Sequence, residues 1–160
     1  KNSIRQMYLK QNKDVIFMVT VTPYSLRKES HSFLECIPVP IHIGQEAPSY
    51  FKKAILESGS EWSDNPKLID TTGKGIKRSV PSGFPYFYVE FALSGKGFAH
   101  IIENENKFSY QFGKEIVSGM LKLPGNAVKS LKSHGDEAER KQMLAFVEMY
   151  KDFDWTVELG

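Results

Sequence analysis

Hydrophobic and polar positions along the chain follow two periods, and the shorter one predicts strands. Asp14–Val21 is an apolar run rich in β-branched residues, which is typical of a buried strand. In Tyr86–Leu93 the apolar residues Phe87, Val89 and Phe91 fall at alternate positions, as in a half-buried strand. Further strands are predicted over Ser32–Val39 and Phe98–Ile102, and the latter forms a hairpin with Tyr86–Leu93 through Ser94–Gly97.

The longer period, close to that of an α-helix, predicts the remaining elements. A first helix covers Lys1–Lys10, and a second has Pro48 in its first turn and continues toward Trp62. Phe112–Met120 carries a third helix. The fourth is capped by Asp136 and has an apolar stripe made of Met143, Leu144, Val147 and Tyr150. This order of elements predicts an α+β domain in which helices cover one side of the sheet.

A long irregular segment, Gly59–Pro85, interrupts these elements, and a loop of this length in a compact domain is often functional. Lys74, Lys77 and Arg78 make it basic. A glycine-containing loop can bring backbone N–H groups and cations together at a phosphate. The residues alone favour the alternative, a plain surface loop.

Aromatic residues crowd the segment from Phe84 to Phe112, and Lys96 stands among them in the predicted hairpin turn. Rings beside cations suit a surface that stacks bases and neutralises phosphates. The alternation of the segment favours a different interpretation for most of the rings, namely the core of a hairpin.

His100 lies in the middle of the strand Phe98–Ile102, on the face of Phe98 and Ile102. In one interpretation it donates a hydrogen bond to an RNA phosphate or to a 2′-hydroxyl. In the other it is a core histidine with a protein partner, and this is the more common situation for a buried polar group.

Composition adds boundaries rather than a function. A net charge of +2 is too small to imply a nucleic-acid partner by itself. Cys36 is the only cysteine, which excludes an internal disulfide and fits a reducing compartment. No apolar run reaches the roughly 18 residues that span a bilayer, so no membrane partner is expected. The chain opens at Lys1 inside a predicted helix, which indicates a piece of a longer protein.

Four segments appear in a characteristic order: ECIPVP (Glu35–Pro40), APSYFKKAILESGSEW (Ala47–Trp62), KLID (Lys67–Asp70) and the stretch Arg78–Leu121. Together they resemble the C-terminal region of the CwfJ family, the Cwf-nineteen-like pre-mRNA splicing factors, over roughly residues 14–155. The resemblance implies that residues 1–46 are the C-terminal part of a histidine-triad-like domain. Residues 47–160 would then be the family's C-terminal α/β region, packed with it as one unit.

The resemblance also implies a function in the nucleus. The module would act in the late spliceosome, where it would bind proteins and RNA, including small nuclear RNA, near the excised intron lariat and assist its turnover. The lariat debranching enzyme is a further expected partner. Within that function the expected RNA-binding residues are Lys74, Lys77, Arg78, Lys96 and His100. No cofactor, metal site or catalytic residue is expected.

The alternative is a nucleotide hydrolase or phosphodiesterase of the histidine-triad type. Such enzymes place three histidines at alternate positions of one strand, so that all three reach the same face. Here the corresponding positions are His31, Phe33 and Glu35. A phenylalanine cannot attack a phosphate and a carboxylate repels one, so two of the three positions argue against this chemistry.

Overall fold

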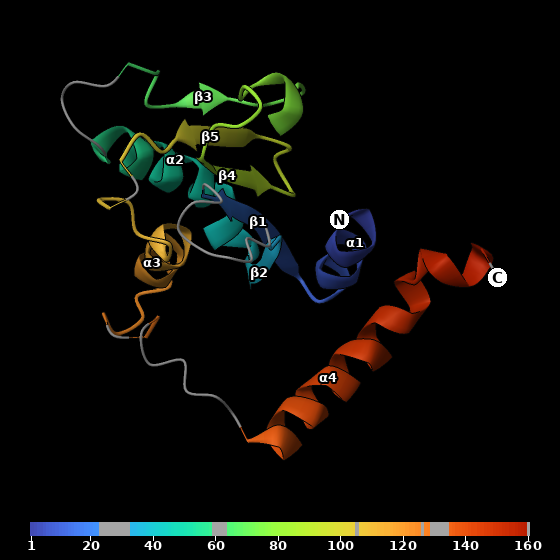
Figure 1. The fold of residues 1–160 in the computed structure, drawn as a ribbon. Coiled ribbons are helices and arrows are strands. Elements are labelled where there is room, and N and C mark those ends of the chain that lie inside the picture. Colours follow the sequence, from blue (N-terminus) through green and yellow to red (C-terminus); the bar gives the residue numbers. More distant parts are fainter. Residues whose placement is uncertain (23–32, 59–63, 105, 126, 129–134, 160) are drawn as a thin grey trace.

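A single antiparallel sheet organises the protein. The computed structural model describes residues 1–22, 33–58, 64–104, 106–125, 127–128 and 135–159. The sheet has the strand order β2-β1-β4-β5-β3 (Figure 1). Its strands are β1 (Lys13–Val21), β2 (Glu35–Pro40), β3 (Ile69–Asp70), β4 (Tyr86–Phe91) and β5 (Gly97–Ile101). The four predicted strands are present with ends shifted by one to three residues, and β3 lies in the segment that was predicted to be irregular. The β4–β5 hairpin turns over residues 92–96, slightly earlier than the predicted Ser94–Gly97.

Four α-helices accompany the sheet among the described residues: α1 (Asn2–Lys10), α2 (Ile41–Glu57), α3 (Phe112–Met120) and α4 (Asp136–Tyr150). Short 3₁₀ turns follow at η2 (Ile76–Arg78), η3 (Lys151–Phe153) and η4 (Trp155–Leu159). The fold is therefore α+β, as predicted. Because no helix of the described chain combines enough length with enough apolar character, none of them could cross a membrane.

The main core lies between the sheet and the pair α2 and α3. Phe87 and Phe91, which alternate along β4, point into it together with Ile16 of β1. From α2, Phe51 and Ile55 fill the opposing wall and are fully buried. The Phe51 ring lies 5.5 Å from the Phe91 ring, edge to face, an arrangement that aromatic pairs favour. The interpretation of most rings as core residues is thus correct.

The opposite face of the sheet is covered as well, which corrects the prediction of one-sided cover. Ile4 and Tyr8 of α1 pack on Phe17 of β1. Farther along the sheet, Val80 closes a smaller cluster over Tyr88 and its neighbours on β5. Strands whose two sets of alternate positions are both apolar require cover on both faces, and β1 and β4 are of this kind.

Prolines lie both in β2 and in the helix that follows it. β2 includes Pro38 and ends at Pro40. This is possible because β2 is an edge strand, where a missing N–H removes no ladder bond on the open side. The second helix starts directly after it at Ile41, so Pro48 lies inside α2 rather than in its first turn.

The last helix also departs from the prediction. The residue before it, Gly135, occupies the capping position, and no side chain caps the helix. Asp136 is instead the first helical residue, where its charge favours the positive end of the helix dipole. No residue of α4 is buried, and its predicted apolar stripe faces outward. Figure 1 shows α4 projecting beside α1, away from the sheet.

Candidate nucleic-acid interface

The predicted basic loop docks on the hairpin turn. The backbone N–H of Thr71 donates to the carbonyl oxygen of Gly97 at 2.9 Å, and the Gly97 N–H donates to Thr72 Oγ1 at 3.2 Å. Lys74 and Lys96, 22 positions apart in the sequence, therefore come to the same end of the sheet. Hydrogen bonds from Thr72, assisted by the charges of these two lysines, hold the pKa of Asp70 below its ordinary value.

We name Lys74, Lys77, Arg78 and Lys96 the basic edge. All four side chains are exposed, and none of them forms an ion pair with another residue that the structure describes. Exposed cations without an ion-pair partner attract a polyanion and can neutralise its phosphates.

The backbone of the loop contributes less than predicted. Gly73 and Gly75 have φ values of +71° and +70°, which side-chain-bearing residues adopt only with strain. The tight turn that they permit directs the N–H groups of Lys74 and Gly75 to the Thr71 carbonyl, at 3.1 and 2.9 Å. These amides are already used, so the basic edge offers phosphates its side chains rather than a backbone cradle.

A groove of about 550 Å³ adjoins the basic edge. Lys77 stands on one side of it, and Phe84 and Tyr86 contribute aromatic surface. Phe84 is 44% exposed, whereas most rings of this segment are buried or half-buried. An exposed ring beside a free cation is the combination that binds single-stranded nucleic acid by stacking and charge. We name this surface the aromatic groove.

His100 does not belong to this surface, because it projects from the other face of β5. Its neighbours in sequence, Ala99 and Ile101, pack beneath the basic loop, so alternation turns His100 toward the side of α2. The structure therefore places Lys74 and Lys96 at the β4–β5 turn and Lys77 nearer the other end of β4, beside Tyr86. His100 lies on the opposite face of β5 from the basic loop.

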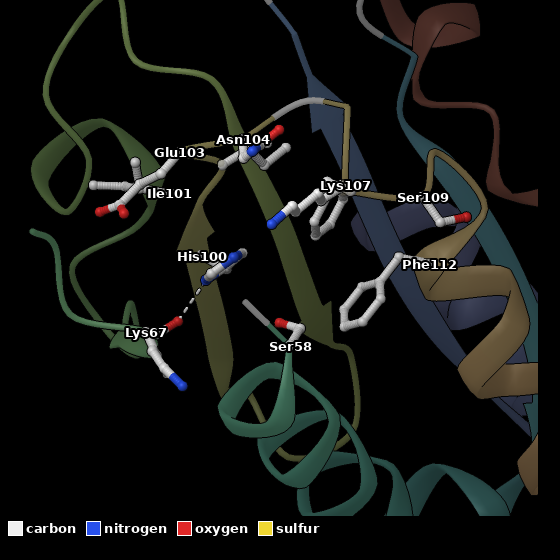
Figure 2. Close-up of a pocket in the computed structure, with 11 residues that line it drawn as sticks. Ser58, Lys67, His100, Ile101, Glu103, Asn104, Lys107, Ser109 and Phe112 are labelled. Atoms are coloured by element: carbon white, nitrogen blue, oxygen red, sulfur yellow. Dashed lines mark hydrogen bonds between the residues drawn. The ribbon is translucent and has the colours of Figure 1, made fainter. Parts of the chain in front are cut away.

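His100 lines a second cavity of about 360 Å³ (Figure 2). The side chain is 8% exposed, and its Nδ1 lies 2.7 Å from the carbonyl oxygen of Lys67. Its ring stacks on Phe108 with 5.8 Å between centroids. The prediction of a core histidine with a protein partner is confirmed for Nδ1. Lys107 and Phe112 line the same cavity, and we name it the His100 pocket.

Sequence reasoning missed the residues that complete the His100 pocket. The Lys67 carbonyl comes from the segment before β3, and Phe108 comes from the connection to α3. The sequence signal for this pocket was the alternation of the Phe98–Ile102 strand. It identified the face on which His100 lies, but not the residues that lie opposite it.

Two of the three positions that correspond to a histidine triad lie within the described chain. Phe33 lies before β2 and is 71% exposed. Glu35 opens β2 and forms an ion pair with Lys114 of α3. His31 lies outside the described residues. A carboxylate that is paired in this way serves to hold α3 on the sheet.

Comparison with known proteins identifies the family. Residues 1–52 match the family model described as "Protein similar to CwfJ C-terminal", and residues 61–156 match "Protein similar to CwfJ C-terminus 2". The second match alone covers more than half of the chain. The chain belongs to the CwfJ family and contains segments of both of its C-terminal regions.

Particular relatives support this assignment. CWF19-like protein 2 of Homo sapiens is 45% identical over 156 residues, which is 98% of this chain and 17% of that protein. The CWF19-like protein 2 homolog of Caenorhabditis elegans is 42% identical over 93% of this chain and 31% of that protein. Pre-mRNA-splicing factor cwf19 of Schizosaccharomyces pombe is 32% identical over 96% of this chain and 25% of that protein. The chain thus spans less than a third of the length of these relatives.

Proposed function

We propose that this protein is a nuclear pre-mRNA splicing module that binds RNA at the basic edge and the aromatic groove. The supporting observation is a set of four exposed cations that form no ion pair within the described chain, of which Lys77 lines a groove together with the exposed ring of Phe84. The printed name of the Schizosaccharomyces pombe relative supports the connection with splicing. In this proposal the module acts in the late spliceosome, near the excised intron lariat, and assists its turnover.

The same proposal includes partners and organisation. Spliceosomal proteins, small nuclear RNA, the intron lariat and the lariat debranching enzyme are its partners. Residues 1–46 belong to a histidine-triad-like domain, and residues 47–160 belong to the region that follows it. Pairing of β1 with β4 and the continuous helix α2 join the two across position 46, which supports their acting as one unit.

The decisive experiment removes charge from the basic edge and keeps the substituted side chains polar. The variant Lys77→Gln/Arg78→Gln is expected to bind single-stranded RNA more weakly. The slope of log K against log salt should flatten by about 0.7 for each lost phosphate contact. Because phosphate contacts carry little sequence information, several unrelated RNA sequences should lose affinity alike. Fluorescence anisotropy at several salt concentrations measures both quantities.

A matched control is available on α2. Lys52 and Lys53 are also adjacent and exposed, and they lie on the opposite side of the sheet. Lys52→Gln/Lys53→Gln changes the net charge equally, so it should reproduce only the general charge effect. If the two double variants weaken RNA binding to the same extent and with the same salt slope, the basic edge is not the contact surface.

The ring of Phe84 provides an independent test of the aromatic groove. Phe84→Ala should weaken binding by about 1–3 kcal/mol if a base stacks on the ring, with little change in salt slope. An unchanged unfolding midpoint would show that the loss comes from binding and not from folding. Unchanged RNA affinity would remove the groove from the proposed site.

A further inference from the structure

The His100 pocket combines three chemical features that the proposed RNA-binding surface does not use. It contains a buried imidazole, an ammonium group on Lys107 and an aromatic wall formed by Phe112. Figure 2 shows the Lys107 side chain reaching across the pocket toward His100, with the Phe112 ring on the side of α3. With about 360 Å³, the pocket is near the lower end of the range for small-molecule sites.

The hydrogen bond to Lys67 determines which nitrogen of His100 can receive a ligand. A carbonyl oxygen can only accept, so the Nδ1 atom 2.7 Å away must carry the proton. In the neutral ring, Nε2 is then an acceptor. Within the described part of the chain Nε2 has no partner, although the side chain is more than nine-tenths buried. Nε2 is not among the unpaired side-chain atoms that are sealed from solvent, so it can accept a hydrogen bond from a ligand that presents a donor.

The other polar groups around the pocket are largely engaged. Ser58 Oγ donates to the Ile55 carbonyl at 2.9 Å. Glu103 accepts from the backbone and the side chain of Asn65, at 2.8 and 2.9 Å. The Lys107 ammonium makes no ion pair with any residue that the structure describes, so a cation and an acceptor remain for a ligand.

We propose that the His100 pocket binds a single unstacked ribonucleotide, whose 2′-hydroxyl donates a hydrogen bond to His100 Nε2. Lys107 neutralises the phosphate, and the base lies against the ring of Phe112. A hydroxyl donor, an anion and a flat apolar ring are the three parts of a ribonucleotide, and the 2′-hydroxyl is the group that separates RNA from DNA. This inference rests on the proposed RNA-binding function. It adds a second binding site, on the other face of the sheet, whose ligand is a ribonucleotide.

The test compares the four ribonucleoside 5′-monophosphates with their 2′-deoxy counterparts. NMR titration of the protein follows the resonances of His100 and Phe112. At least one ribonucleotide should bind about 3- to 10-fold more tightly than its deoxy form, the net worth of one hydrogen bond. Equal affinities of the two forms in the unaltered protein would overturn the assignment of Nε2.

Two variants separate the roles within the pocket. In His100→Asn the amide nitrogen can still donate to the Lys67 carbonyl, but no atom reaches the position of Nε2. The preference for ribose should therefore disappear, whereas His42→Asn, at an exposed histidine of α2, should keep it. Lys107→Gln should weaken ribose and deoxyribose forms alike. If the ribose preference persists in His100→Asn, another group recognises the hydroxyl and the proposal is wrong.

Oligonucleotides show whether the ligand is a free nucleotide or a residue of an RNA strand. A short single-stranded RNA and the same strand with one 2′-deoxy position are titrated alongside the mononucleotides. Tighter binding of the strand at His100 indicates a residue within RNA, and equal binding indicates a free nucleotide. If neither moves the His100 resonances while Lys77→Gln/Arg78→Gln still weakens RNA binding, the pocket inference fails and the proposed function stands. If RNA moves the His100 resonances but Lys77→Gln/Arg78→Gln leaves RNA binding unchanged, the basic edge is not part of the RNA-binding surface.

Discussion

Helices α2 and α4 have similar lengths, 17 and 15 residues, but opposite fates in the fold. α2 buries Phe51 and Ile55 completely against the sheet. α4 buries nothing, and Leu144 and Val147 of its apolar stripe are each 55% exposed. Its side-chain contacts with the rest of the chain include a hydrogen bond from Gln11 to Met149 beside α1.

An apolar stripe therefore predicts a helix without predicting its burial. Both sequences place apolar residues at helical spacing, but only α2 directly follows a strand that belongs to the sheet. The chain leaves β2 at Pro40 and enters α2 at Ile41, so α2 must lie against the sheet. The tertiary contacts of α2, rather than its propensity, supply most of its stability.

The largest expected difference in stability is between two substitutions, one of a phenylalanine in α2 and one of a phenylalanine in α4. Phe51→Ala should lower the free energy of unfolding by about 3–5 kcal/mol, because it opens a cavity between Phe87 and Phe91. Phe146→Ala in α4 removes a ring that stacks on Tyr150 and is 38% exposed, so it should cost less than about 1 kcal/mol. Denaturant unfolding measures both. Equal losses would mean that α4 is packed in solution.

The next largest difference in stability is expected from two glycine-to-alanine substitutions, one of which should destabilise the protein and the other stabilise it. A Cβ at Gly44 of α2 would lie 2.3 Å from Asp14 Oδ2 and 2.6 Å from Asp14 Cβ, so Gly44→Ala should cost about 1–3 kcal/mol. A Cβ at Gly119 of α3 meets no atom within 4 Å, and Gly119→Ala should gain about 0.5–1 kcal/mol from helix propensity. Thermal and denaturant midpoints report the two signs. A destabilised Gly119→Ala would contradict the open space around this position.

A titratable group, Asp14 of β1, lies where α2 packs against the sheet at Gly44. Burial raises the pKa of Asp14 above its ordinary value, although backbone N–H groups of Val15 and Leu93 donate to Oδ1 and oppose the shift. Asp14 Oδ2 has no partner among the described residues. A raised pKa means that the folded state holds the proton more strongly than the unfolded state. The contribution of Asp14 to stability is present below its unfolded pKa and is lost as pH rises through its folded pKa.

Asp14→Asn should therefore become more stable relative to the parent as pH increases from about 3 to about 7. The Asn oxygen can still accept both backbone N–H groups, so this variant isolates the charge. Unfolding midpoints of both proteins over this range provide the measurement. Two parallel curves would show that Asp14 titrates with the same pKa in both states.

The smallest expected effect concerns the ion pair that ties α3 to β2. Lys114 and Glu35 are each about a third exposed, at 36% and 34% of their side-chain area. Lys114→Met should cost about 0.2–1 kcal/mol, and the cost should shrink at high salt because solvent ions screen the pair. The pair between Glu148 in the last turn of α4 and Lys151 is more exposed, so Lys151→Met should leave the unfolding midpoint unchanged. If the stability lost in Lys114→Met is the same at low and high salt, the loss comes from packing and not from charge.

Sequence reasoning succeeded where the information is local. The hairpin of β4 and β5 followed from two alternating runs around a short glycine-containing turn, and alternation also identified the core face of Phe87 and Phe91. It failed where the partner is distant. The basic edge depends on hydrogen bonds between Thr71–Thr72 and Gly97, which no periodicity reveals.

Periodicity along the chain was enough to locate four of the five strands, the helical segments and the face on which each alternating residue lies. These follow from the periods of 2 and 3.6 residues, which are properties of the local backbone. Only the tertiary structure decided that His100 faces a pocket closed by Lys67 and Phe108, and that α4 stays uncovered. Burial depends on which elements meet across the sheet, and that choice belongs to the free energy of the whole chain rather than to any one segment.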